Sequence, residues 1–356
     1  MDQERKDISR RQFLAGAAAL SSAPIIASCS GDGKMPLSPN VNTIPNSPSG
    51  KPQAGTMPKR TFGKTGLSVS ILGFGCGSNF SVLSDPTGRF AALDAALAGG
   101  INYFDTCSEY GTAGTLGNYF SASTVPVPRD QIFIADKLNA RDYAGAKSEF
   151  ANQLTQLKTT YVDVLLCHAL PSTLDLTALN SATGAWTFLK EAKANGTARF
   201  IGFSSMDTSA AAAGGVCPRF ITDLNPDVCT LAMNISGYGN FKTATLPVAD
   251  AANCGVAAIK TLLGAVGGTN TASICLGYLW GLKDAKGNDA IATLIVGHHD
   301  GASQVDTNVA IAKAKTGVLS YDWGQVERNA KPLAGPHALA WARPDFKDNG
   351  KPYIWS

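Results

Sequence analysis

The sequence has little charge and few residues of the types that bind metals. Charged residues make up 16% of its 356 residues, and the formal net charge is +3. No basic run occurs beyond the first dozen residues, so a nucleic-acid-binding surface is not expected. Only four histidines are present, with no Cys-x-x-Cys and no His-x-His spacing. A metal ion held by the protein is therefore not expected either.

Long apolar runs are also missing beyond the N-terminal thirty residues, since no stretch of 18 apolar residues occurs there. A membrane-spanning helix in the body of the chain is therefore not expected. Hydrophobic residues nevertheless make up 44% of the sequence. That content is normal for a globular domain with a sizeable core.

The first thirty residues have the pattern of an export signal. A twin arginine, in Ser9-Arg-Arg-Gln-Phe-Leu14, follows a charged start and precedes an Ala-rich apolar run that ends near Ile26. This pattern is typical of proteins that cross the membrane already folded. The alternative is a chance Arg-Arg before a buried helix. The joint presence of the motif and the apolar run favours the signal.

The segment that follows suggests a lipid anchor and a tether. Ile26-Ala-Ser-Cys29 resembles a bacterial lipobox, in which cleavage before the cysteine leaves Cys29 lipidated. The alternative is ordinary cleavage near the same small residues. Residues 30–58 carry six of the 18 prolines and show no apolar periodicity, which predicts a disordered linker. We thus expect a signal in 1–29, one domain from 59 onward, and a periplasmic or lipid-anchored protein in the bacterial envelope.

Eight cysteines in an exported chain suggest disulfides. Most of them lie in or beside apolar runs, where a buried thiol behaves as a small hydrophobe. Cys217 and Cys229 form the plausible disulfide pair, because they bracket a loop-like segment.

Short apolar runs alternate with segments whose apolar residues recur at helical spacing. The apolar runs are 71–75, 101–104, 132–135, 161–167, 199–203, 230–234, 256–259 and 293–296, and the helical segments include 89–98, 144–157, 186–194 and 272–282. Eight such runs predict an α/β fold, a (β/α)8 TIM barrel, preceded by a β-hairpin in 59–69.

A doubly wound sheet is the main alternative. It would need Gly-x-Gly-x-x-Gly at the first strand end, and Gly73-Phe-Gly-Cys-Gly77 does not continue that pattern.

Four polar residues follow consecutive predicted strands: Asp105 and Tyr110 the second, Lys137 the third and His168 the fourth. In a TIM barrel the active site lies at these C-terminal strand ends. A tyrosine titrates near 10, so it needs a nearby lysine to stabilise its anion. An aspartate can hold that lysine, and a histidine can orient a substrate carbonyl. This set suits proton transfer to a carbonyl oxygen while a hydride reaches the carbon, or the reverse.

Each of these residues also has a structural explanation by itself. The aspartate could cap a helix, the tyrosine and histidine could pack in the core, and the lysine could be solvated. Their joint occurrence in this order favours catalysis. A barrel hydrolase with paired carboxylates would need a second acid, for which Glu109 and Asp136 are the candidates. Both directly flank the four polar residues, so strand alternation predicts that they face away from the site.

Four segments resemble the aldo-keto reductase family over nearly all of residues 59–316. They are 60–75 (RTFGKTGLSVSILGFG), 100–111 (GINYFDTCSEYG), 161–168 (YVDVLLCH) and 201–205 (IGFSS). The resemblance implies that Tyr110 is the proton donor, that Lys137 and Asp105 tune it, and that His168 orients the substrate. It also implies a nicotinamide cofactor, NADP or NAD, and a small carbonyl or alcohol substrate. A binding or regulatory protein that kept the barrel but lost turnover is the alternative.

The resemblance also implies contacts to the nicotinamide and the pyrophosphate. Ser204 and Ser205 stand where the family has a Ser-Asn pair that binds the carboxamide. Asn234 stands at the sixth strand end, where the family often has Gln or Asn. Lys260 follows the seventh strand, where the familiar stacking tyrosine is missing, and is expected to reach the pyrophosphate as a point charge.

Residues 297–308 occupy the family's adenosine-phosphate segment and supply His298, His299, Gln304 and Asn308 as cofactor contacts. Asn308 stands where an adenine contact is usual. Gln304 stands near the expected arginine, and a neutral amide cannot pair bidentately with a 2′-phosphate. The choice between NADP and NAD is therefore open.

The resemblance fades after residue 316. Residues 317–356 form an aromatic-rich C-terminal extension with four prolines. We expect it either to close the substrate pocket or to pack on the outside of the barrel.

Overall fold

The computed structural model describes residues 56–122, 125, 127–237, 239–262, 271–314, 323–330, 347–348 and 351–352. The predicted signal in 1–29 and nearly all of the predicted linker in 30–58 lie outside these residues. Among the helices described, none is both long and apolar enough to cross a bilayer.

Eight parallel strands close into a barrel in the order β10-β3-β4-β5-β6-β7-β8-β9. Their bounds are β3 (Leu72–Gly75), β4 (Tyr103–Asp105), β5 (Phe133–Leu138), β6 (Val162–Cys167), β7 (Ala198–Ser205), β8 (Val228–Ala232), β9 (Gly255–Ile259) and β10 (Thr293–Val296). Each predicted apolar run overlaps one strand, so the prediction of a (β/α)8 barrel is confirmed. The runs are continuous because these strands are buried both inside the barrel and under the helices.

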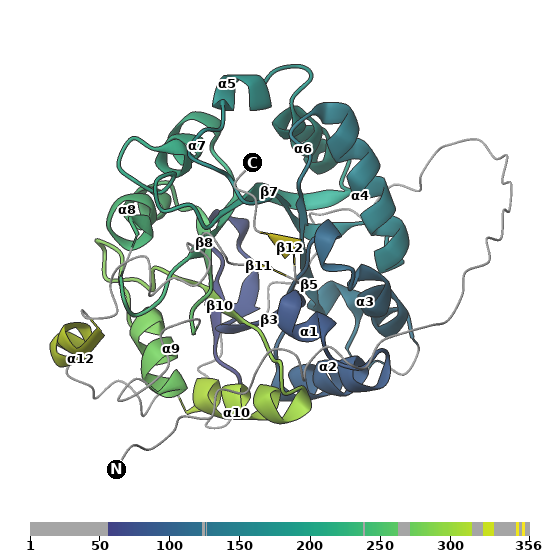
Figure 1. The fold of residues 1–356 in the computed structure, drawn as a ribbon, viewed down its shortest axis with the longest axis vertical. Coiled ribbons are helices and arrows are strands. Elements are labelled where there is room, and N and C mark those ends of the chain that lie inside the picture. The colour runs from purple at the N-terminus through teal and green to yellow at the C-terminus, as the bar shows by residue number, and fades with distance from the viewer. Residues whose placement is uncertain are drawn as a thin grey trace, which may run out of the picture. The chain divides into compact units, whose positions relative to one another are not determined.

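Helices surround the barrel as a ring (Figure 1). Their bounds are α1 (Ser78–Ser81), α2 (Thr87–Gly99), α3 (Ala113–Phe120), α4 (Tyr143–Leu157), α5 (Leu176–Leu179), α6 (Ala185–Ala194), α7 (Val216–Leu224), α8 (Leu246–Ala251), α9 (Ala272–Trp280) and α10 (Ala302–Lys313). α4 shows how local sequence sets these bounds. The side chain of Asp142 accepts a hydrogen bond from Gly145 N at its start, and Lys158 adopts a left-handed conformation at its end.

The predicted hairpin consists of β1 (Lys59–Thr61) and β2 (Ser68–Ser70), joined through the 3-10 turn η3 (Gly63–Thr65). Phe62, at the start of this turn, is fully buried and meets Tyr103 of β4 edge to face at 5.5 Å. Lys64 N donates to Asn253 O, just before β9 begins. The hairpin therefore packs against the N-terminal ends of the strands, which leaves the opposite ends for a site.

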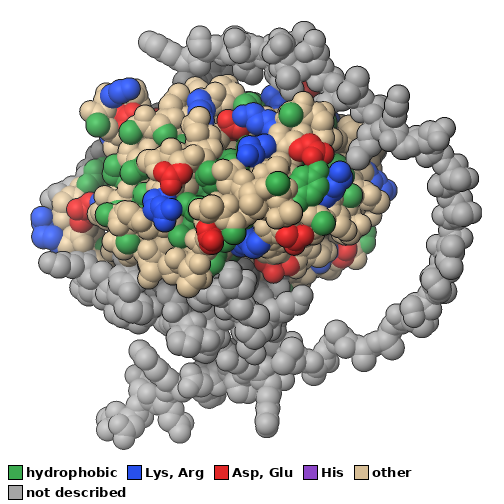
Figure 2. All heavy atoms as spheres, turned by 90° about the horizontal axis from the view of Figure 1, so that it is seen from above, with side chains coloured by type: hydrophobic (Ala, Val, Ile, Leu, Met, Phe, Trp, Pro, Cys, Tyr) green, Lys and Arg blue, Asp and Glu red, His purple; other side chains and the backbone are tan. Residues whose placement is uncertain are grey.

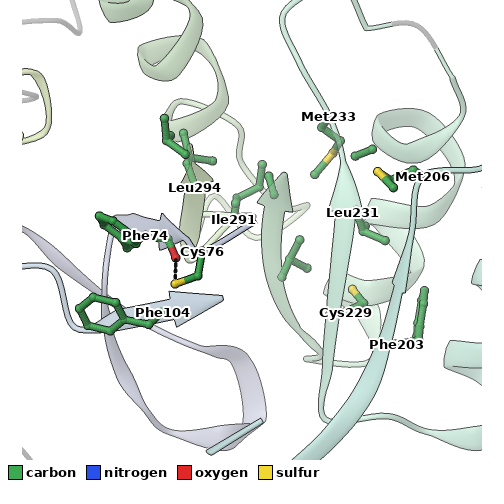
Figure 3. Packing of buried hydrophobic residues seen from close by; sticks show 14 of the residues in the cluster. Phe74, Cys76, Phe104, Phe203, Met206, Cys229, Leu231, Met233, Ile291 and Leu294 are labelled. Atoms are coloured by element: carbon green, nitrogen blue, oxygen red, sulfur yellow. Dashed lines mark hydrogen bonds between the residues drawn. The ribbon is translucent and has the colours of Figure 1, made fainter. Parts of the chain in front are cut away.

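The strand side chains that face the helices form an apolar layer, in which Phe74, Phe104 and Leu294 pack on neighbouring strands (Figure 3). Cysteines belong to this layer as well. All seven cysteines in the described part of the chain are free and buried, so Cys217 and Cys229, the pair that the sequence left plausible, form no disulfide. Burial raises the pKa of Cys217 to about 12, so its sulfur is a protonated thiol. These sulfurs fill apolar space as small hydrophobes.

Part of the C-terminal extension is the helix α12 (Trp323–Ala330). Trp323 packs against Tyr278 of α9 with ring centroids 6.0 Å apart. Glu327 accepts hydrogen bonds from Tyr278 Oη at 2.9 Å and Lys242 Nζ at 3.0 Å. This helix therefore lies on the outside of the barrel, which was one of the two positions expected for the extension. Most of the rest of the extension lies outside the described residues.

Basic and acidic side chains are interspersed on the face of the barrel domain in Figure 2. That distribution accords with the small net charge of +3.

Two glycines offer a matched test of the packing. A Cβ on Gly202 of β7 would lie 1.8 Å from Val228 O on β8, so Gly202→Ala must push the strands apart. We expect a loss of about 3 kcal/mol in the free energy of unfolding, measured with urea. A Cβ on Gly114 of α3 meets nothing within 4 Å, so Gly114→Ala should leave stability unchanged or raise it by about 0.5 kcal/mol. Equal effects of the two substitutions would contradict this account.

Candidate active site

The structure brings together the four polar residues that the sequence singled out. Asp105 ends β4, Lys137 lies near the end of β5, and His168 directly follows β6. Tyr110 ends the 3-10 turn η4 (Ser108–Tyr110), which leads from β4 into α3. Because β4, β5 and β6 are neighbours in the closed barrel, these side chains meet at one side of its C-terminal mouth.

The Lys137 ammonium is the centre of the cluster. Its Nζ lies 2.5 Å from Asp105 Oδ1, 2.8 Å from Thr106 O and 3.5 Å from Tyr110 Oη. Burial by itself would lower the pKa of Lys137, but the attraction of Asp105 and other nearby groups outweighs it and raises the pKa above its ordinary value. A fixed positive charge therefore stands beside the Tyr110 hydroxyl, where it favours the phenolate form.

The His168 ring is held at both nitrogens. Its Nδ1 lies 2.9 Å from Ser204 Oγ, and its Nε2 lies 3.3 Å from Glu109 Oε1. A carboxylate can only accept, so the neutral ring carries its proton on Nε2 and accepts from Ser204 at Nδ1. Ser204 Oγ in turn accepts from Ala169 N at 2.9 Å. Burial lowers the pKa of His168 despite the carboxylate, which keeps the ring a neutral donor.

The contact between Glu109 and His168 shows that one prediction was wrong, because Glu109 does not turn away from the site. Strand alternation does not apply to it, since the chain leaves β4 at Asp105 and enters a 3-10 turn at Ser108. Asp136, which does lie within a strand, follows the alternation. Its Oδ1 accepts from Gln153 Nε2 of α4 at 2.9 Å, and burial raises its pKa to about 7. A hydrolase would need a second carboxylate at the mouth, opposite Glu109. Asp136 does not supply it, because its side chain faces α4.

Cys107, Glu109 and His168 each place one potential metal-ligand atom within 4.8 Å of the others. Sequence spacing did not suggest this group, because the three residues come from two different strand ends. Burial raises the pKa of the Cys107 thiol far above its ordinary value. In this structure the Cys107 side chain is therefore a neutral thiol.

The expected nicotinamide contacts have partners within the protein. Both Ser204 hydrogen bonds go to the His168 region, and Ser205 Oγ donates to Leu170 O at 2.8 Å. Asn234 is buried two residues beyond β8, with its Oδ1 accepting from Ser236. Ser204 thus positions the histidine, a role that sequence reasoning missed. Nothing in the sequence of residues 201–205 indicates that Ser204 contacts His168.

The expected adenosine-phosphate residues divide into a buried pair and a pair nearer the surface. His298 is fully buried, stacks on Phe74 at 4.8 Å, and has Nδ1 3.3 Å from Asn308 Nδ2. The second pair contacts Asp300. The exposed His299 has Nε2 3.2 Å from its carboxylate, and the half-buried Gln304 accepts with Oε1 from its backbone N–H at 3.4 Å.

The mouth beside β9 and β10 nevertheless retains groups that fit a nucleotide. Thr261 Oγ1 and His298 Nε2 are buried without a hydrogen-bond partner among the described atoms. Lys260 follows β9 with a positive φ of 60°. The first turn of α10, which begins after Gly301, has no side-chain cap on its backbone N–H groups. Donors of this kind suit a phosphate.

Buried His298 makes stability depend on pH. Burial, with a smaller effect of His299, lowers the pKa of His298 to about 3. The unfolded chain binds this proton near pH 6.5, so the stability present above pH 6.5 is lost as the pH falls toward 3. At pH 5 the protonation of this group lowers the free energy of unfolding by about 2 kcal/mol. Urea unfolding at pH 7.5 and 5.0 should show a smaller loss in His298→Gln than in the wild type. His299→Gln, which changes an exposed ring and removes only the smaller cause of the lowered pKa, should keep most of the loss.

Comparison with known proteins agrees with this geometry. Residues 72–273 match the model of the aldo/keto reductase family. The L-galactose dehydrogenase of Arabidopsis thaliana is 31% identical over 160 residues, or 41% of this chain and 48% of that protein. The D-galacturonate reductase of Fragaria ananassa is 27% identical over 150 residues, or 38% and 47%. The chain thus spans about half the length of the curated relatives it matches.

Solved structures show the same fold. An aldo-keto reductase described as putative, from Pseudomonas aeruginosa, has a TM-score of 0.59 at 21% identity, over 74% of this chain and 98% of that one. The holo form of an aldo-keto reductase from Bacillus halodurans has a TM-score of 0.59 at 20% identity, over 78% and 97%. The family model covers more than half of the sequence, so the chain belongs to the aldo/keto reductase family.

Proposed function

We propose that this protein is an NAD(P)-dependent oxidoreductase that interconverts a carbonyl and an alcohol, with Tyr110 as the proton donor or acceptor. The observation that carries the proposal is the Tyr110 hydroxyl 3.5 Å from a buried Lys137 ammonium that is itself bonded to Asp105. Residues that served only to stabilise the fold would not need this arrangement, because burying a charged pair is costly. The matched family and the relatives named as a dehydrogenase and a reductase support the same chemistry.

A nicotinamide nucleotide, when bound, supplies or takes up the hydride. In reduction, Tyr110 Oη gives its proton to the substrate oxygen, and the Lys137 ammonium stabilises the phenolate that remains. Asp105 and the Thr106 carbonyl hold this ammonium in place. In oxidation the phenolate takes the proton back from the alcohol.

His168 orients the carbonyl rather than protonating it. Burial lowers its pKa, so the ring is neutral near pH 7 and presents Nε2–H as a hydrogen-bond donor. The Tyr110 and His168 rings meet edge to face with centroids 6.4 Å apart. A carbonyl oxygen between them would accept from Tyr110 Oη and from His168 Nε2, which leaves its carbon open to hydride.

The nucleotide would lie across the strand ends from β7 to β10. Ser204, Ser205 and Asn234 stand on the nicotinamide side. Lys260 and the first turn of α10 would face the phosphates, and the segment with His298, His299, Gln304 and Asn308 the adenosine. Gln304 offers no positive charge to a 2′-phosphate, so the proposal includes both NAD and NADP.

The names of the two relatives also support a hydroxylated substrate. One is an L-galactose dehydrogenase and the other a D-galacturonate reductase, and both names refer to sugar-derived compounds. We propose a small carbonyl compound or alcohol with further hydroxyl groups.

Removal of one hydroxyl tests the proposal. Tyr110→Phe should lower carbonyl-dependent oxidation of NADH or NADPH by roughly 10³-fold, because general acid catalysis contributes about 10²- to 10⁴-fold. Quenching of protein fluorescence should show unchanged nucleotide binding. Tyr143→Phe is the control, because it removes a phenol hydroxyl on α4 that bonds to Glu191. Unchanged turnover in Tyr110→Phe would rule out Tyr110 as the proton donor. No binding of either nucleotide to the wild type would favour a non-enzymatic binding protein.

We also propose that the protein is exported by the twin-arginine route and works in the envelope, released or anchored through Cys29. The motif Ser9-Arg-Arg-Gln-Phe-Leu14 with its apolar run supports this proposal. Free nicotinamide nucleotide is not expected outside the cytoplasm. Folded export removes the difficulty, because the nucleotide can be bound before transport and retained.

Cell fractionation checks the export proposal. A variant with Arg10→Lys and Arg11→Lys should accumulate in the cytoplasm, because the route depends on the arginine pair. Cys29→Ala should still leave the cytoplasm but should move from the membrane fraction to the soluble periplasmic fraction. An unchanged distribution of the double lysine variant would show that the motif is not a signal.

A further inference from the structure

We infer that Glu109 determines substrate specificity: it favours carbonyl compounds with a hydroxyl on the neighbouring carbon and disfavours those with a carboxylate there. The inference rests on the proposed function, since it takes Tyr110 and His168 as the groups that bind the substrate oxygen. It adds a residue that the sequence had placed outside the site.

Glu109 lies where it can reach the atoms next to a bound carbonyl. It directly precedes Tyr110 in η4, and its Oε1 lies 3.3 Å from His168 Nε2. Its side chain is 45% exposed, whereas that of His168 is 4% exposed. The carboxylate therefore lies between the buried ring and the solvent at the mouth.

Binding of a carbonyl oxygen exchanges one hydrogen bond for another. The oxygen must take the Nε2–H of His168, which the Glu109 carboxylate accepts in this structure. A hydroxyl on the neighbouring carbon can then donate to Glu109, so the carboxylate receives a donor in return. A simple aldehyde brings no such donor. A hydrogen bond to a half-exposed carboxylate corresponds to roughly tenfold in kcat/KM.

The charges around the site disfavour an anion at the same position. The acidic groups near His168 are Asp105 and Glu109. The cations are Arg141 and Lys137, of which Lys137 is buried and bonded to Asp105. Arg141, from the following loop, donates to the backbone carbonyls of His168 and Asn139. A substrate carboxylate beside the carbonyl would therefore face Glu109, a like charge, at short range.

Three small aldehydes separate these effects: propanal, 2-hydroxypropanal and glyoxylate. We expect the wild type to prefer 2-hydroxypropanal to propanal by roughly tenfold in kcat/KM and to use glyoxylate poorly. Glu109→Gln keeps an acceptor but removes the charge, so it should raise kcat/KM for glyoxylate roughly tenfold. Glu109→Leu removes both, so it should abolish the preference for 2-hydroxypropanal. Ratios between substrates within one variant do not depend on the fraction of folded enzyme.

Asp223→Asn is the matched control, because it removes the same charge from a side chain on α7 that is 49% exposed. It should leave all three ratios as in the wild type. Ratios in Glu109→Gln and Glu109→Leu that equal those of the control would overturn the inference while carbonyl reduction, and so the proposed function, still held. No reduction of any of the three aldehydes by the wild type would count against both.

Discussion

The structure of the mouth depends on one buried ion pair, Lys137 with Asp105 at 2.5 Å. A charge taken out of water is costly unless its partners are close and complete. Here the ammonium has a carboxylate, the Thr106 carbonyl and the Tyr110 hydroxyl within 3.5 Å. These partners come from one strand, β4, and the turn after it. The pairing of β4 with β5 thus determines both where the charge lies and which hydroxyl it acts on.

The same arrangement explains why the two ends of the barrel differ. At the N-terminal ends, Phe62 of the hairpin packs against Tyr103, so apolar contacts fill the opening. At the C-terminal ends, the polar side chains of β4 and β5 share the opening with His168 and its partners, Ser204 and Glu109. The backbone N–H of Ala169 donates to Ser204, and Ser204 holds the His168 ring in one tautomer. The Glu109 carboxylate lies beside His168 Nε2, the atom that would donate to a substrate carbonyl.

Much of this could be predicted from the sequence, because parallel strands of a barrel are buried on both faces and leave a simple apolar pattern. The eight runs each matched a strand, and polar residues directly after a strand had to lie at the mouth. Contacts that depend on the turns were harder to predict from the sequence. Glu109 sits in a 3-10 turn, where the alternation rule for strands gives no direction, and Ser204 meets His168 from the next strand, 36 residues away.

The sequence by itself determined the barrel, its hairpin and the identity of the four polar residues, because hydrophobic periodicity and strand order are local properties of the chain. Only the tertiary structure decided which groups touch. It placed Glu109 beside His168, left Cys217 and Cys229 as free thiols, and put α12 on the outside of the barrel. The physical reason is that hydrogen bonds and ion pairs act over about 3 Å. The direction of a side chain after a turn is set by the packing of elements far apart in sequence.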